Sequence, residues 1–127
     1  MSEENKYKMR VTANAFFLPE QSDEHKDQFV FAYTIKITNL GSVAAKLISR
    51  HWVITDAEMR VQEVRGMGVV GEQPVLGPGE SFEYTSGASL ETSMGTMRGA
   101  YQMLAEDGTK FDALIAEFTL SVPRVLH

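Results

Sequence analysis

A glycine-rich segment is the first part of this sequence whose residue types and spacing could do chemistry. Gly66, Gly68 and Gly71 follow the pattern GxGxxG, which in dinucleotide-binding proteins lets backbone N–H groups approach a pyrophosphate. That use needs a strand before the motif and a helix that begins at it, and two prolines and two glycines in residues 72–79 prevent the helix. The sequence therefore argues against a Rossmann-type site and favours a glycine-rich crossover between two sheets.

A simpler anion site would need no helix, only glycine amides next to cationic side chains. Arg50, Arg65 and Arg98 all lie near glycine-rich or turn segments, and arginine binds phosphate through paired N–H groups. We therefore keep open a site for pyrophosphate or a dinucleoside polyphosphate. The alternative is that each arginine pairs with a nearby carboxylate such as Glu72. Strand alternation also puts Arg50 on the face of Trp52, where it is half-buried and structural unless a bulge turns it outward.

The remaining polar side chains do not form a complete catalytic or metal-binding set. His25 lies in a charged turn and His127 is the last residue, while His51 next to Trp52 is more typical of a packed strand residue than of a base. The chain has no cysteine and no GxSxG motif. His51 and the carboxylates at turns could contribute to a divalent-metal site, but a hard-cation cage needs about six oxygens or more. We expect no catalytic residues, no metal site and no cofactor.

Alternating apolar and polar residues predict a domain made of short strands. In residues 29–37, every second side chain is a large apolar or aromatic one, which predicts a strand with one buried face. Similar runs between turn residues predict seven strands, at residues 7–18, 29–38, 44–55, 60–65, 81–86, 96–105 and 110–122. The 127 residues are therefore expected to form a single all-β domain, with Trp52 in the core of an immunoglobulin-like sandwich.

The overall charge limits the partners of this domain. The formal net charge is −5, which opposes binding to nucleic acid and to anionic membrane surfaces. No basic and apolar leader is present, and no apolar run approaches the roughly 20 residues that span a bilayer. We expect a cytoplasmic protein that binds neither nucleic acid nor membrane, with residues 1–6 disordered. An exposed sheet edge would allow a homodimer through strand pairing.

Four long strings in the sequence resemble those of the bacterial ApaG family. They are SRHWVITDA at 49–57, VRGMGVVGEQP at 64–74, PGESFEYTSG at 78–87 and GTMRGAYQM at 95–103. The resemblance extends from about Val11 to Leu126. One departure follows the first string, where family members usually have Asn-Gly and this chain has Glu58 and Met59. The turn is therefore expected to be longer or of another type.

The resemblance implies a fibronectin type III-like or immunoglobulin-like β-sandwich of about seven strands. It also implies a link to cobalt resistance, as in CorD, and to magnesium efflux, with a gene often near a diadenosine tetraphosphate hydrolase. Similar domains in eukaryotic F-box proteins and in a polymerase-associated protein look like protein-interaction modules. The family provides no catalytic residues that could be assigned to this sequence.

Sequence and resemblance together favour a non-enzymatic module that binds another protein. The expected contact surface is formed by residues 66–79 and the connection at 87–95. Arg65, Met67 and Glu72 are the expected contact residues, and an exposed Met67 would supply the apolar centre of the interface.

Two other hypotheses remain open at this point. The first is a small-anion sensor in which the Gly66–Gly71 loop acts with Arg65 and Arg98. The second is a divalent-metal binder, suggested by the physiology that the resemblance implies.

Overall fold

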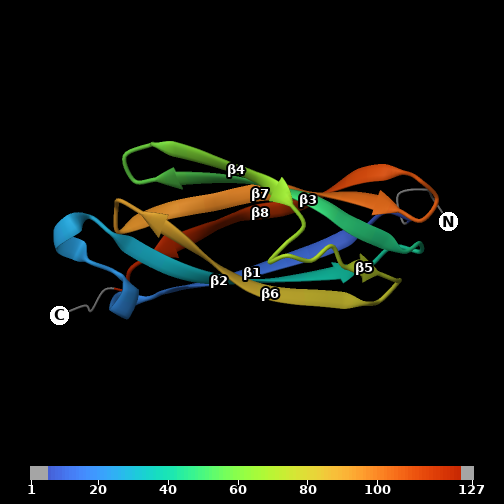
Figure 1. Cartoon of the computed structure of the whole chain (residues 1–127), viewed down its shortest axis with the longest axis horizontal. Coiled ribbons are helices and arrows are strands. Elements are labelled where there is room, and N and C mark those ends of the chain that lie inside the picture. The colour runs from blue at the N-terminus through green and yellow to red at the C-terminus, as the bar shows by residue number, and fades with distance from the viewer. Residues whose placement is uncertain (1–5, 124–127) are drawn as a thin grey trace.

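Two antiparallel sheets pack face to face in the computed structural model, which describes residues 6–123 (Figure 1). The smaller sheet has the order β1-β2-β6, and its strands are β1 (Met9–Phe17), β2 (Phe29–Asn39) and β6 (Ser81–Leu90). The larger sheet has the order β4-β3-β7-β8, and its strands are β3 (Ala45–Asp56), β4 (Val61–Met67), β7 (Met94–Ala105) and β8 (Lys110–Ser121). A short strand, β5 (Val75–Leu76), also pairs with β3. The predicted fibronectin type III-like, immunoglobulin-like sandwich is thus confirmed.

The remaining regular elements are short. Two 3-10 turns, η2 (Pro19–Gln21) and η3 (Glu24–Lys26), connect β1 to β2. Within residues 6–123 there is no helix with the length and apolar character needed to cross a membrane. The sequence predicts disorder for residues 1–6. Residues 1–5 lie outside the described residues.

Trp52 lies at the centre of the core that joins the two sheets. Its side chain is 2% exposed. The centroid of its ring lies 5.4 Å from that of Tyr33 on β2, 5.9 Å from that of Phe118 on β8 and 6.3 Å from that of Tyr101 on β7. These edge-to-face contacts stabilise by about 0.5–1.5 kcal/mol each beyond area burial. A single residue of the large sheet thereby contacts both sheets, as the sequence predicted for this tryptophan.

Three details of the strands differ from the sequence prediction. The short β5 was not predicted, since two residues carry no periodicity. The connection expected at 87–95 is wrong in its first part, because β6 continues to Leu90 and Gly87 pairs with Ala32 of β2. The crossover between sheets does not fall in the GxGxxG segment. It follows β5 at residues 77–80, where the Gly79 N–H donates to the Asn39 carbonyl at 2.8 Å.

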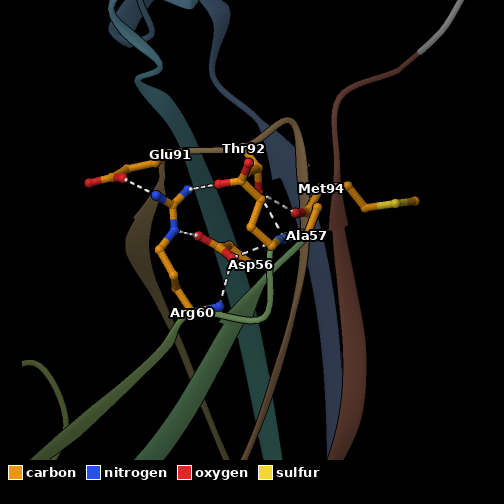
Figure 2. Close-up of polar contacts among 7 residues, drawn as sticks. Asp56, Ala57, Arg60, Glu91, Thr92 and Met94 are labelled. Carbon is orange, nitrogen blue, oxygen red and sulfur yellow. Dashed lines mark hydrogen bonds and ion pairs between the residues drawn. The ribbon is translucent and has the colours of Figure 1, made fainter.

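A polar network closes the tip of the β3–β4 hairpin (Figure 2). Asp56 Oδ1 accepts hydrogen bonds from the backbone N–H groups of Glu58 and Arg60, both at 2.9 Å. Arg60 Nε donates to Asp56 Oδ2 at 2.6 Å, and its other nitrogens pair with Glu58 at 2.8 Å and with Glu91 at 3.0 Å. Since Glu91 follows β6, Arg60 fastens the β3–β4 turn to the β6–β7 turn.

Met59 occupies a backbone conformation that glycine usually adopts. Its φ is 66°, and its N–H donates to the Asp56 carbonyl at 3.1 Å. Met59 is therefore a non-glycine residue at a position of the turn that has positive φ. A left-handed conformation costs an L-residue roughly 1–2 kcal/mol.

We expect Met59→Gly to raise the free energy of unfolding by about 1 kcal/mol, because glycine relieves this strain and loses part of the gain to its own chain entropy. Met59→Ala is the matched control, since it removes the same exposed side chain and keeps the strained φ. Urea unfolding measures both variants. Equal stability of the two variants would show that the positive φ at this position does not lower the free energy of unfolding.

The Asp56 carboxylate should make stability depend on pH. Burial acts to raise the pKa of Asp56, but hydrogen bonds from Arg60 and from the Glu58 N–H outweigh it and hold the pKa below its ordinary value. A group with a lowered pKa in the folded state stabilises above its unfolded pKa and loses that effect as pH falls through the folded pKa.

Asp56→Asn should therefore lower the melting temperature near neutral pH, and the difference from the parent should shrink as pH falls from about 5 to about 2. Thermal melts followed by circular dichroism measure this, with Asp112→Asn on the exposed part of β8 as the control. A difference that stays constant over the whole range would assign the loss to hydrogen-bond geometry and not to charge.

Candidate functional site

The sandwich is closed along one side and open along the other. β1 packs against β8 on the closed side, whereas β4 and β6 leave a groove between them. Its volume is about 970 Å³, and its walls include Gln62 and Val64 of β4 and residues 86–90 of β6, while Trp52 and Met97 form the floor. The open side therefore offers a recess large enough for a ligand.

Arg50 lies in the middle of this open side. Alternation along β3 turns it inward with Trp52, and it lines both the main groove and a smaller adjoining pocket of about 270 Å³. It is half-buried, as the sequence allowed. A register shift in the β3–β7 pairing, between Leu47 and Ser49, comes just before it. Arg50 thus brings a positive charge into the space between the sheets.

The GxG part of the glycine motif accommodates this guanidinium group. Gly66 is the cross-strand partner of Arg50, and a Cβ at Gly66 would lie 2.8 Å from the Arg50 guanidinium carbon. Arg50 Nη1 donates to the carbonyl oxygens of Met67 at 3.1 Å and Gly68 at 2.8 Å. Strand alternation does not reveal which side chain lies across a glycine. The sequence therefore did not predict that Gly66 makes room for Arg50.

The backbone amides of the motif are largely engaged within the loop itself. The Gly68 N–H donates to the Ile48 carbonyl at 2.8 Å, the Val69 N–H to the Glu72 carbonyl at 2.8 Å and the Glu72 N–H to the Val69 carbonyl at 2.9 Å. These bonds close a tight two-residue turn at Val70 and Gly71. Amides that already donate are not available to an anion, so this geometry weighs against an anion site formed by the loop.

Val70 holds an unusual conformation at this turn. Its φ is 43° and that of Gly71 is 81°, which are the signs of a type I′ turn. A β-branched residue at positive φ is a true outlier, and such strain concentrates at functional positions. Val70 is also exposed and lines the smaller pocket with Met67. The strained turn therefore presents an apolar side chain at the rim of the open side.

The two exposed arginines lie on the outer face of the large sheet, away from the groove. Arg65 is cross-strand from His51 and lies 3.8 Å from Glu63. Arg98 is cross-strand from Val53, and both positions alternate with residues that face inward. The structure therefore places Gly66 and Met67 at the end of β4 and Gly68, Gly71 and Glu72 in the loop that follows. It separates Arg65 and Arg98 from the inward face of this segment.

His51 also faces outward. Its Nε2 lies 2.9 Å from Glu63 Oε1, so it forms an exposed cross-strand pair. No group of three or more His, Cys, Asp or Glu side chains suited to a metal ion occurs within residues 6–123.

Two tyrosine hydroxyls join the sheets behind the groove. Tyr84 of β6 and Tyr101 of β7 hydrogen-bond to each other through their hydroxyls. Burial raises the pKa of both tyrosines well above the ordinary value, so both stay neutral. They contribute a fixed polar contact next to Arg50 without adding negative charge.

Three comparisons with known proteins give consistent results. The family model described as ApaG domain matches residues 19–105. A protein named ApaG from Thiobacillus denitrificans is 65% identical over 127 residues, with full coverage of both chains, and one from Dechloromonas aromatica is 61% identical with the same coverage. A crystal structure of a Bordetella pertussis protein named ApaA superposes with a TM-score of 0.92 at 57% identity, covering 95% of this chain and 98% of that chain.

We expect Gly66→Ala to lower the free energy of unfolding by about 1–2 kcal/mol, because the added methyl group displaces the Arg50 guanidinium from its two carbonyl acceptors. Arg50→Met supplies the second arm of a double-mutant cycle, measured by urea unfolding. In the Arg50→Met background, Gly66→Ala should lower the free energy of unfolding only slightly. An equal cost in both backgrounds would mean that glycine is needed for the backbone alone.

Proposed function

The chain belongs to the ApaG domain family, and we propose that it is a non-enzymatic module that binds another protein by adding an extended segment of that partner to the β4 edge. The observation that carries this proposal is the concentration of exposed apolar side chains along β4.

Apolar side chains gather on β4 and the segments next to it. Ten large hydrophobic residues are exposed in the described chain, and six of them lie between residues 59 and 75: Met59, Val61, Val64, Met67, Val70 and Val75. Six of the seven β4 residues are exposed, and Gly66 is partly buried. A strand that is exposed on both faces buries little apolar surface within its own domain. Clusters of exposed apolar side chains are typical of interaction surfaces.

The backbone of β4 has one side free for pairing. The Gly68 N–H donates to Ile48 at one end, and the Arg60 carbonyl accepts from the Asp56 N–H at the other. Because hydrogen-bonding direction alternates along an antiparallel strand, residues 62, 64 and 66 bond to β3, and the backbone groups of residues 61, 63 and 65 point outward. The Met67 carbonyl already accepts a hydrogen bond from Arg50. Such an edge is a template for strand addition.

A partner segment paired with the β4 edge would contact the residues that the sequence predicted. Met67 supplies the apolar contact, with 68% of its surface exposed, and Arg65 and Glu72 lie next to it at the polar rim. A second copy of this chain could occupy the same edge by antiparallel pairing, so the predicted homodimer uses the same surface.

Other parts of the proposal concern location and physiology. We place the module in the cytoplasm, and its acidic net charge favours neither membrane nor nucleic acid. A role in cobalt and magnesium homeostasis would be indirect, exerted through the partner. In support of this, residues 6–123 contain no cluster of three or more metal-ligating side chains of the His, Cys, Asp or Glu type.

Glu63→Pro should abolish partner capture while leaving the domain folded, because proline removes an outward N–H that β3 does not use. Capture from a bacterial lysate by the immobilised parent, Glu63→Pro and Met67→Asp measures the effect. Both variants should lose the same bound proteins. Sedimentation velocity of the three proteins tests whether the captured species is a second copy.

Val64→Pro is the structural contrast, since it removes an N–H directed at β3 and should lower thermal stability where Glu63→Pro does not. The proposal is wrong if folded Glu63→Pro and Met67→Asp both retain every protein that the parent captures.

A further inference from the structure

We propose that the groove between β4 and β6 binds a small organic carboxylate with an apolar body, whose oxygens accept hydrogen bonds from Arg50. This site is separate from the outward edge of β4 and does not rest on the protein-binding proposal. It also differs in place and in residues from an anion site formed by the Gly66–Gly71 loop with Arg65 and Arg98.

The first observation is a half-buried cation without a counter-ion. Arg50 uses Nη1 to donate to the Met67 and Gly68 carbonyls. Within residues 6–123, its Nε and Nη2 have no hydrogen-bond partner and the guanidinium forms no ion pair with a carboxylate. A guanidinium group that is partly removed from water is stabilised by a negatively charged acceptor. Three N–H bonds of Arg50 are therefore free to bind one.

The second observation is a buried donor without an acceptor. Trp52 is 2% exposed, and its Nε1–H is the one fully buried side-chain polar atom in the described chain that lacks a partner. A buried donor without an acceptor destabilises the folded state. Trp52 lines the same groove as Arg50 and lies two residues from it on the same face of β3. Because the indole nitrogen is itself buried, it reports on a ligand above the ring, and the acceptor oxygens of the ligand belong at Arg50.

The surroundings of the groove narrow the ligand class. Asp27 and Glu91 also line the groove, and these carboxylates would repel a polyphosphate more strongly than a single carboxylate. Its floor is apolar, and its volume of about 970 Å³ is large enough for a small organic molecule. A single carboxylate on an apolar body fits this combination, with the carboxylate at Arg50 and the body over the floor.

The single tryptophan of the chain allows a direct test. The parent protein is titrated with benzoate, hexanoate, acetate and pyrophosphate, and the Trp52 emission and the one indole N–H signal in a ¹H–¹⁵N spectrum are followed. We expect saturable changes with benzoate or hexanoate that exceed those with acetate. Arg50→Met should weaken this binding about tenfold or more, whereas Arg65→Met and Arg98→Met should leave it unchanged.

Three outcomes would overturn the proposal. The first is an indole N–H signal that stays in place with every probe, which would show that none of them binds above Trp52. The second is binding that persists in Arg50→Met. The third is tighter binding of pyrophosphate that depends on Arg65 or Arg98. Because the indole signal is followed in the parent protein, the test remains decisive if Arg50→Met does not fold.

Discussion

The guanidinium of Arg50 is the constraint on which the open side of this sandwich depends. Alternation along β3 sends Arg50 inward with Trp52, and a positive charge between two sheets requires oxygen acceptors nearby. The carbonyls of Met67 and Gly68 supply them, and glycine at position 66 leaves the necessary space. The glycine motif, the end of β4 and the shape of the groove are therefore consequences of one inward-facing side chain.

The closed and open sides of the molecule follow from how each sheet ends. β1 and β8 meet along one side, so apolar residues there are covered by the opposite sheet. On the other side, β4 extends beyond the cover that β6 provides, and most of its residues are exposed on both faces. Aromatic packing around Trp52 and the tyrosine hydroxyl pair hold the two sheets together behind this gap. The domain can therefore keep an uncovered strand without losing its core.

Much of the fold could be predicted from the sequence, because period-two alternation is a local signal. It identified the seven main strands and the buried position of Trp52, and the four long strings identified the family. It failed for β5, which is too short to have a period, and for Gly87 to Leu90, where small residues hid a continuing strand. The role of Gly66 depends on which residue lies across the sheet, and the lone Trp52 N–H depends on its surroundings. The spacing of residue types along the chain predicts neither property.

The exposed strand has a consequence for how the domain opens. β4 is joined to the rest of the molecule mainly through β3 and through Arg60 at its tip, and it buries little apolar surface. Opening of β4 should therefore require much less free energy than global unfolding, so its amides belong to a cooperative unit of low stability. A molecule that binds only the ordered strand would stabilise this unit first, by RT ln(1 + [L]/Kd). Slower hydrogen exchange confined to β4 would then report occupancy before any change in the melting temperature.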